Sequence, residues 1–545
     1  MAITQDLEKI IEGDVQDSEE ILTKYSQDAS IFKIKPDAVV FPKTSKDICN
    51  LVNFCTSNPG YSLTARCAGT CMSGGAINDS LIVDMTKYFN NVIKIGDEVA
   101  LTQPGVFYRD FEKETLKQGL ILPCYTASRD INTVGGMVGN NSAGEKTLSY
   151  GQTLDYVKKL KVILSDGNEY LFYPTAKNEL DKKISQKNFE GEIYSKIYKL
   201  VSENSEAIKK ARPGVSKNSA GYNLWDVLND DIFDMTKLIT GSQGTLGIVT
   251  EIEFKLVKKT SHSNLVVIFL NDLKVLPEVI SKVLEQKPES FESYDDYTLK
   301  FAVRFLPEVI KLIDPNNAFK LAFKFLPEIW MSLTGGLPKL VLLAEFTGNS
   351  EEEVMEKCIK ANEGLKTLKL KTRITSSEEE AKKYWTIRRQ SFSLLRHHAK
   401  HMRTAPFIDD IIVKPEFLPE FLPKLRQILD KYKNKMVYTI AGHIGNGNFH
   451  IIPLVDLSDP QTRELIPKLS EEVFSLVFEY KGSMSGEHND GIVRGPFLEK
   501  MYGKEIFELF KQVKTIFDPK DIFNPHKKTD ASMEFLMHNI NTTNI

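Results

Sequence analysis

The chain has 545 residues, of which 41% are hydrophobic and 26% charged, and its 70 Lys and Arg against 73 Asp and Glu leave a formal net charge of -3. At about 150 residues per domain this length predicts two to four domains, and the ordinary composition excludes wholesale disorder. The near-neutral balance excludes a chain-wide basic surface for nucleic acid, while six cysteines that never form CxxC exclude a disulfide framework, a zinc ribbon and a ferredoxin-type cluster.

The amino end carries no recognisable export signal. Residues 1–24 are acidic and lack the apolar core of a signal peptide, and no apolar run in the chain approaches the roughly 20 residues that span a bilayer. Together with the cysteine pattern, this predicts a cytoplasmic protein. The other end, residues 533–545, has the composition of a polar tail.

The first half of the chain alternates short strands with helices. Residues 1–35 predict short helices, and strands are then expected at 38–42, 61–66 and 80–85, with helices over 45–55 and 108–118. Apolar runs on both sides of Gly96-Asp97, and again of Asp166-Gly167, predict two β-hairpins. The alternation continues to about Val257 and indicates an α+β domain with mixed sheets.

A second region of sheet and helix is predicted over 264–375, with strands at 264–270 and 339–346. A long helix follows, then two more strands at 408–413 and 436–442, and the end of the chain is again helical.

Within this region, LKFAVRFLPEVI (299–310) is echoed by FKLAFKFLPEIW (319–330). In each copy two basic residues four positions apart share a helical face, and phenylalanines supply an apolar face. Basic amphipathic helices can lie on a membrane surface, so 299–335 is a candidate for peripheral membrane contact. The alternative, which the usual core-facing role of apolar helical stripes favours, is two short helices that cover a sheet.

Three loops rich in glycine, serine and threonine interrupt the first region, at 66–76, 133–151 and 241–254. Glycine lets the main chain approach a ligand closely and exposes amide donors, so three such loops predict a long ligand that is touched along its length. The Rossmann fingerprint is excluded, because no GxGxxG opens a helix after the first strand.

These loops, in this order, resemble the FAD-binding domain of the vanillyl-alcohol-oxidase-type flavoproteins. More narrowly, the chain resembles the FAD-linked D-2-hydroxyacid dehydrogenases, which include D-lactate, D-2-hydroxyglutarate and glycolate enzymes, over roughly residues 36–528. The resemblance implies an α+β fold in four parts. These are an N-terminal helical segment (1–35), an FAD-binding domain (36–260), a substrate or cap domain with a metal site (261–515) and a C-terminal segment that returns to the flavin (516–545).

The same resemblance implies which residues contact FAD. Residues implied at the pyrophosphate are Arg66, Ala68, Gly69, Thr70, Ser73 and Gly74. Those implied along the flavin and pyrophosphate are Thr133, Gly135, Gly136, Asn140, Ser142, Ala143 and Gly144, and those on the adenine side are Gly247, Ile248 and Val249. Asn524 and Pro525 in the closing motif would return the chain towards the flavin.

Two positions of the first loop bear on how FAD is attached. Members with covalent flavin carry His where this chain has Thr70, so the resemblance implies non-covalent FAD. Cys67 replaces a usual glycine, and both Cys67 and Cys71 are expected to be packed thiols.

Two short motifs in the carboxyl half gather histidines. GHIGNGNFH (442–450) contains two histidines on either side of a glycine-bearing turn, and SGEHNDG (485–491) places a glutamate beside a third. Two imidazoles and a carboxylate suit a divalent ion, and nitrogen ligands favour zinc; the alternative is polar loops with structural histidines.

The motifs resemble the paired signatures of the family's C-terminal domain. This implies His443, His450 and Glu487 as metal ligands and His488 as the catalytic base. Two departures stand out, because Asn446 occupies a position where many members have Asp, and Asn489 one where Gly is usual.

Recognition of a small acid requires a fixed positive group, and arginine can hold a carboxylate through two parallel hydrogen bonds. KKYWTIRRQSF (382–392) resembles the family's W-x-x-R segment, which implies Arg388 as the clamp, with Arg389 as the fallback and a solvated helix face as the alternative. Ile408 and Ile452 stand where the 2-hydroxyglutarate members have Lys and Asn, which favours a monocarboxylate. The role of Lys217, in a further family-like segment, is left open.

The predicted reaction is oxidation of a D-2-hydroxy acid, D-lactate above others, by hydride transfer to FAD. Electrons would pass to a quinone, a cytochrome or an electron-transfer flavoprotein. Glycolate and D-2-hydroxyglutarate are alternative substrates. A further alternative is a non-redox enzyme like alkyldihydroxyacetone-phosphate synthase, which shares the fold. That enzyme carries a run of histidines where this chain has SGEHNDG, so Glu487 argues against it. A non-catalytic flavoprotein subunit is the last alternative. A homodimer is compatible with the sequence.

Overall fold

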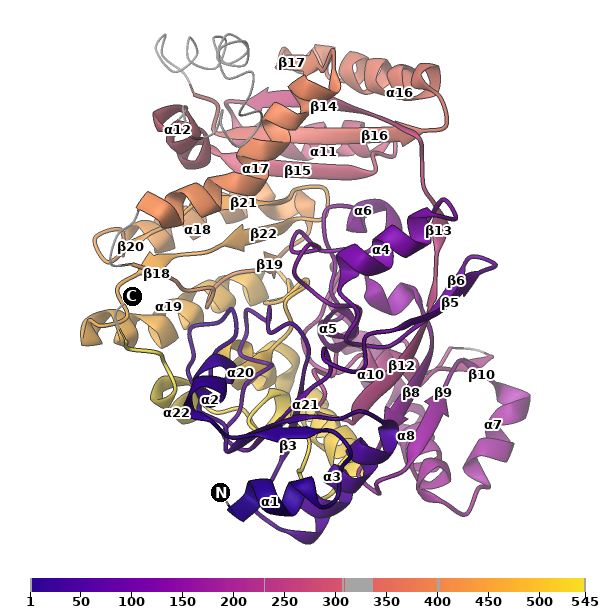
Figure 1. Cartoon of the computed structure of the whole chain (residues 1–545). Coiled ribbons are helices and arrows are strands. Elements are labelled where there is room, and N and C mark those ends of the chain that lie inside the picture. Colours follow the sequence, from indigo (N-terminus) through magenta and orange to yellow (C-terminus); the bar gives the residue numbers. More distant parts are fainter. Residues whose placement is uncertain (1, 230, 306–307, 309–336, 399–401, 544–545) are drawn as a thin grey trace.

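The computed structural model describes residues 2–229, 231–305, 308, 337–398 and 402–543 (Figure 1). The second copy of the basic repeat, at 319–330, therefore lies outside the described residues. In the first copy, helix α12 (Asp296–Arg304) is described, and its Lys300 ammonium lies 2.6 Å from the carboxylate of Asp296. Within the described ranges, no helix combines the length and apolar character that crossing a membrane would require.

The amino-terminal part begins with a four-stranded sheet in the order β1-β2-β4-β3. Its elements are α1 (Ala2–Glu8), β1 (Asp14–Gln16), α2 (Glu19–Tyr25), β2 (Ala38–Phe41), α3 (Ser45–Ser57), β3 (Leu63–Arg66) and β4 (Leu81–Asp84). The three predicted strands pair in parallel, because a helix and then the first glycine loop make the connections between them. The sequence did not predict β1, a three-residue strand that pairs antiparallel with β2.

A second, antiparallel sheet has the order β5-β6-β12-β8-β9. Its strands are β5 (Val92–Gly96), β6 (Val99–Thr102), β8 (Val157–Ile163), β9 (Glu169–Phe172) and β12 (Ile248–Lys255). Both predicted hairpins are confirmed, and β12, which follows the third glycine loop, joins them through pairing with β6 and β8. Helices α4 (Tyr108–Leu116) and α8 (Phe189–Glu203) contribute buried side chains to the core beside this sheet.

The carboxyl half is organised around a seven-stranded sheet in the order β17-β14-β16-β15-β21-β22-β19. Its strands are β14 (His262–Leu270), β15 (Ser290–Asp295), β16 (Leu340–Gly348), β17 (Lys371–Ile374), β19 (Ile411–Ile412), β21 (Ile440–His443) and β22 (Asn448–Ile451). Strand β14 alternates between two cores, because successive side chains point to opposite faces. Val266 and Ile268 pack with helices α11 (Leu276–Leu284) and α16 (Glu351–Gly364), whereas Val267 packs with α12 and α17 (Glu378–His398).

The last segments of the chain run back to its beginning, so that the yellow C-terminal elements lie beside the indigo N-terminal ones in Figure 1. The helices are α18 (Leu418–Asp430), α19 (Pro460–Glu479), α21 (Leu498–Phe517) and α22 (Met533–His538). Phe510 and Phe517 of α21 are buried in the core beside the five-stranded sheet. The prediction of a polar tail was wrong, because Met533–His538 is helical and the backbone of Ile540 pairs with that of Phe32.

The remaining elements are short. They are β7 (Leu120–Ile121), α5 (Val134–Asn140), α6 (Thr147–Tyr150), β10 (Thr175–Ala176), α7 (Lys177–Ile184), α9 (Ser205–Ala211), β11 (Ile232–Phe233), α10 (Thr236–Ile239), β13 (Val257–Lys258), β18 (Arg403–Thr404), β20 (Met436–Val437), β23 (Leu454–Val455) and α20 (Gly491–Arg494).

Candidate active site

A cavity of about 730 Å³ lies where the three glycine loops meet, and Glu487 and His488 form part of its wall. Of the residues predicted to contact FAD, those that line the cavity are Ala68, Gly69, Thr70, Thr133, Gly135, Gly136, Asn140, Ser142, Gly247 and Val249. The structure therefore brings all three loops, and the second histidine motif, to one space.

Two glycines show that this space is suited to a close-fitting ligand. A Cβ atom added to Gly139 or Gly244 would lie 4.0 or 3.8 Å from the nearest protein atom outside its own segment, although the backbone at both positions lines the cavity. A side chain there would take up cavity volume before it met protein, so the glycines leave room for a bound molecule. Gly69 is glycine for a different reason, because its φ of +69° belongs to the left-handed region.

The other predicted FAD residues do not line the cavity, namely Arg66, Ser73, Gly74, Ala143, Gly144, Ile248 and Asn524. Several of them hold the loops in place instead. Arg66 donates hydrogen bonds to the carbonyls of Tyr25 (3.0 Å) and Gln27 (2.8 Å). The Asn524 amide donates to the carbonyls of Gly75 (2.9 Å) and Gln243 (2.7 Å), which ties the first loop to the third.

Gln243 is a structural residue that the sequence analysis missed. Its Nε2 donates to Ser73 Oγ (3.2 Å) and Asn140 Oδ1 (3.0 Å), and its Oε1 accepts from the amide of Gly491 (2.8 Å). One side chain thus connects all three glycine loops with the segment that carries His488. The GSQG sequence marked the loop, but nothing in it distinguished this glutamine.

The two predicted metal-ligand histidines lie on neighbouring strands of a β-hairpin. His443 on β21 pairs with Asn448 and His450 on β22 pairs with Ala441, so the two imidazoles project from the same face in diagonal positions. Their Nε2 atoms are 3.2 Å apart. Glu487 completes the group, with Oε1 2.9 Å from His443 Nε2 and Oε2 3.9 Å from His450 Nε2.

Each histidine is also close to a buried carboxylate through its other nitrogen. Glu292 Oε1 lies 2.5 Å from His443 Nδ1, and Asp409 Oδ1 lies 3.3 Å from His450 Nδ1. Carboxylates in this position fix the imidazole tautomer and leave Nε2 as the ligand atom. Neither Glu292 nor Asp409 was predicted, because they lie 151 and 41 residues away in the sequence from the histidines they contact.

The arrangement fits a divalent cation. One ligand atom from each of His443, His450 and Glu487 lies within 4.8 Å of the others, and a two-nitrogen, one-oxygen set is typical of catalytic zinc. Asp409, His450 and His488 form a second group of the same compactness. The first group is favoured as the metal site, because the Nε2 atoms of His443 and His450 point towards each other and towards Glu487.

The charges around Glu487 are balanced by a buried lysine. Lys217 Nζ pairs with Glu487 Oε1, and both side chains are almost fully buried. Burial opposes ionisation, but the positive charges of Lys217 and His443 hold the pKa of Glu487 well below its usual range. The residue whose role was left open therefore lies in the site and keeps Glu487 ionised.

His488 lies beside the metal group, and its ring contacts the same carboxylate as that of His450. Its Nδ1 is 2.9 Å from Asp409 Oδ2, and its ring stacks on that of His450 with centroids 5.3 Å apart. Burial opposes protonation, but the carboxylates of Asp410 and Asp409 raise the pKa of His488 to about 9.

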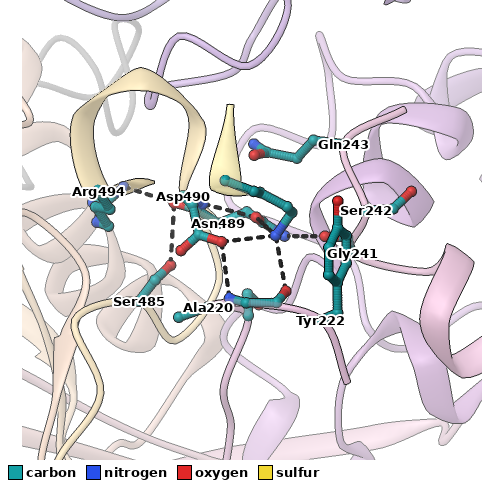
Figure 2. A network of polar contacts seen from close by, with 12 residues as sticks. Ala220, Tyr222, Gly241, Ser242, Gln243, Ser485, Asn489, Asp490 and Arg494 are labelled. Carbon is teal, nitrogen blue, oxygen red and sulfur yellow. Dashed lines mark hydrogen bonds and ion pairs between the residues drawn. The ribbon is translucent and has the colours of Figure 1, made fainter. Parts of the chain in front are cut away.

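A network of buried polar contacts holds the segment that carries Glu487 and His488. Figure 2 shows Asn489 and Asp490 at the meeting point of three segments. Their own segment contributes Ser485 and Arg494, a second contributes Ala220 and Tyr222, and the third is Gly241 to Gln243. Asn489 donates to the carbonyl of Gly241 (2.8 Å), and Asp490 accepts from Lys528 (2.7 Å). Asn489 has a φ of +64°, which explains why a glycine can also serve at this position.

The predicted carboxylate clamp has a protein partner. Arg388 Nε and one terminal nitrogen lie 3.2 and 3.0 Å from Glu292 Oε2, so Arg388 supports the carboxylate that anchors His443. The fallback, Arg389, forms two hydrogen bonds with Glu145, at 2.7 and 2.6 Å, and so joins α17 to the second glycine loop. Among the cavity-lining residues that the structure describes, the one arginine is Arg403 on β18.

Comparison with known protein families matches two domains. The FAD binding domain matches residues 36–170, and the C-terminal domain of FAD linked oxidases matches residues 259–528.

Curated relatives extend over nearly the whole chain. It is 27% identical to a D-2-hydroxyglutarate dehydrogenase of Escherichia coli over 92% of its length, and 27% identical to the glycolate oxidase subunit GlcD of Bacillus subtilis, again over 92%. It is 25% identical to a D-lactate dehydrogenase of Anaerostipes hadrus over 91%. The chain spans about half (49%) of the E. coli protein, but 91% and 90% of the other two.

Solved structures with the same fold include p-cresol methylhydroxylase with substrate bound, with a TM-score of 0.66 at 15% identity over 97% of this chain and 96% of that chain. An alkyldihydroxyacetonephosphate synthase has a TM-score of 0.65 at 15% identity over 94% of this chain and 83% of that chain. At this identity the likeness concerns the fold alone. It confirms the predicted α+β architecture with a p-cresol-methylhydroxylase-type FAD-binding domain.

Proposed function

Because the chain belongs to the FAD-linked oxidases that include the D-2-hydroxyacid dehydrogenases, we propose that it oxidises a D-2-hydroxy acid to the 2-oxo acid. One observation carries this proposal. The cavity formed by the three glycine loops shares a wall with His488 and Glu487, so a cofactor and a substrate hydroxyl can be held in contact.

Each group of residues in the site has a separate proposed role. The glycine loops would hold FAD, which would supply a hydride acceptor for C2 of the acid, and His443, His450 and Glu487 would hold a divalent cation, which would supply polarisation of the C2 hydroxyl. His488 accepts the hydroxyl proton. It must be neutral to do so, and a divalent cation held at the neighbouring Glu487 would favour the neutral imidazole, because like charges repel.

Arg388 is proposed to fix the substrate carboxylate, which aligns C2 with the flavin. Two of its nitrogens are within 3.2 Å of Glu292, so this role depends on its remaining N–H groups. The guanidinium would then join the substrate to the group that anchors His443.

For the substrate we favour a monocarboxylate such as D-lactate. Ile408 is fully buried and Ile452 is half-buried, and neither offers a donor to a second carboxylate. Glycolate and D-2-hydroxyglutarate remain the alternatives, and the latter is the substrate that the E. coli relative's name specifies. A quinone, a cytochrome or an electron-transfer flavoprotein is proposed to take the electrons.

The predicted domain division is retained as part of this proposal. Residues 36–260 would hold FAD non-covalently and 261–515 would supply the metal and substrate groups, while 516–545 returns to the first domain. The burial of Asn524 between two glycine loops supports such a return.

The experiment is anaerobic reduction of the FAD-loaded protein, followed at the visible flavin bands, with D-lactate, D-2-hydroxyglutarate and glycolate in turn and with zinc added. We expect D-lactate to bleach the flavin fastest. The variant His488→Ala should bind FAD but lose bleaching by about 10² to 10⁴-fold, the usual contribution of a general base. Absence of bleaching by every acid tested in the metal-loaded wild type would refute the proposed reaction.

A further inference from the structure

We propose that Asp409 is a positioning residue that orients the metal-ligand candidate His450 and the base candidate His488 with a single carboxylate. The proposal rests on the proposed function above and identifies a residue that makes the two histidines act together.

The geometry around Asp409 is that of a bridge. Its side chain is fully buried, with Oδ1 3.3 Å from His450 Nδ1 and Oδ2 2.9 Å from His488 Nδ1. The two imidazole rings are stacked with their planes inclined by 27°, and the Nδ1 of each lies within 3.3 Å of the same carboxylate. One carboxylate oxygen serves each ring.

Asp409 is itself held firmly enough to act in this way. Its Oδ1 accepts a hydrogen bond from the backbone amide of Ile451 (3.0 Å), the residue after His450. Its backbone carbonyl accepts from the guanidinium of Arg494 (2.7 Å), which is fully buried and also donates to the carbonyl of Asn489 (2.9 Å). These bonds connect Asp409 to the strand of one histidine and to the segment of the other.

The inferred consequence for each ring is a preferred tautomer. The two Nδ1 contacts are ion-pair distances of 3.3 and 2.9 Å, and a carboxylate this close to Nδ1 favours the proton there and leaves Nε2 with its lone pair. In His450 that Nε2 atom faces His443 and Glu487, where a metal ligand is needed. In His488 the free Nε2 is the nitrogen that can accept a substrate proton.

Two neighbouring carboxylates, Asp410 and Glu292, make different contacts from Asp409 and can therefore be compared with it. Asp410 accepts hydrogen bonds from the backbone amides of Glu487 (2.8 Å) and His488 (2.7 Å), so it shapes the main chain. Glu292 anchors His443 alone. Among the described residues, Asp409 is the carboxylate that reaches both His450 and His488.

The test compares Asp409→Asn with Glu292→Gln and with Asp295→Asn, a buried carboxylate on β15 that contacts none of these histidines. Two quantities are measured on FAD-loaded protein. The first is zinc affinity, by titration of metal-free protein in competition with a chelator. The second is the rate of flavin reduction in a single turnover at saturating zinc and D-lactate.

We expect Asp409→Asn to weaken zinc binding by about 10 to 100-fold, as loss of a partner behind a metal ligand does. At saturating zinc it should still slow flavin reduction by at least about 100-fold with less than about threefold change in the apparent Kd for substrate, because the base is misoriented. Glu292→Gln should weaken zinc binding comparably and, once zinc is saturating, should reduce flavin faster than Asp409→Asn. Asp295→Asn should change both quantities by less than about threefold.

Flavin reduction by Asp409→Asn at the wild-type rate with zinc saturating would overturn the proposal, as would wild-type zinc affinity. If Asp409→Asn does not retain FAD, nitrogen-15 spectra of the wild-type histidines decide, and Nδ1-protonated His450 and His488 are expected. A neutral ring that carries its proton on Nε2, in either histidine, would overturn the proposal. If no 2-hydroxy acid reduces the wild type, the proposed function fails, and zinc affinity and the spectra still test Asp409.

Discussion

The buried ion pair between Asp490 and Lys528 supports a prediction whose magnitude can be worked out. Lys528 Nζ lies 2.7 Å from Asp490 Oδ2 and donates to Asn489 Oδ1 (2.7 Å) and the carbonyl of Gly221 (2.9 Å), and both charged side chains are fully buried. The substitution Lys528→Met removes the positive charge and leaves the Asp490 carboxylate with the Gly221 amide (2.8 Å) as its main donor.

Breaking one side of a buried pair typically costs about 3–5 kcal/mol, because the remaining charge has lost its compensation. Unfolding entropy of about 2.1 cal/mol/K per residue gives about 1.1 kcal/mol/K for 545 residues that unfold together. The expected fall in melting temperature is therefore about 3–4 °C. Asp490→Asn should cost less, since burial already lowers the pKa of Lys528 and the lysine can lose its proton.

The assay is thermal unfolding followed by far-ultraviolet circular dichroism, for both single variants and for the double variant. The double variant should lose less than the sum of the single losses, because the two residues interact. Lys511→Met is the control, since its lysine is exposed and lies 3.7 Å from Glu508, a pair worth at most about 1 kcal/mol. A melting temperature of Lys528→Met within 1 °C of the wild type would refute the reasoning.

Three further predictions concern pH, the cavity and the membrane. Burial raises the pKa of Asp295 from 3.8 to about 6, so its contribution to stability is present below about pH 4 and is lost as the pH rises through 6, by about 3 kcal/mol in all. Asp295→Asn should flatten the melting temperature between pH 4 and 8, and an unchanged slope would show that another group is responsible. Gly139→Leu should fill the cavity and weaken FAD binding at least tenfold in a fluorescence titration with little change in stability, whereas wild-type affinity would place FAD elsewhere. If residues 299–335 dock on membranes, the protein should bind anionic vesicles at low salt and be released near 1 M salt; no binding at low salt would leave the interpretation of two covering helices.

Local patterns in the sequence were sufficient for much of the fold. Both hairpins, the strands of the first parallel sheet and the long helix α17 follow from short-range alternation, turn residues and helical spacing. The strand β1 and the last helix α22 did not, because a three-residue strand and a six-residue helix carry too little periodicity. Strand β1 depends on pairing with β2, and α22 precedes Ile540, whose backbone pairs with that of Phe32; no local pattern records either contact.

For the candidate site, the sequence marked the residues that face the cavity better than those that support them. Glycine loops and histidine motifs are recognisable because each is contiguous. The supporting residues act through contacts with residues far away in the chain, so composition and spacing could not assign their partners. They are Glu292, Asp409, Gln243 and Lys217. Arg388 shows the same limit, since its motif indicated an anion site but could not reveal that the fold also gives it an internal carboxylate partner, Glu292.

Asn489 shows how a departure from a family pattern can fit the structure around it. The left-handed backbone at this position would be easier for glycine, but the asparagine amide donates to the carbonyls of Asn140 (3.1 Å) and Gly241 (2.8 Å). Its Oδ1 accepts from Lys528 (2.7 Å), which at the same time neutralises Asp490. The residue after His488 is therefore tied to the second and third glycine loops and to the C-terminal segment. Because the same side chain contacts the loops that form the cavity, the position of His488 is coupled to the walls that are proposed to hold FAD.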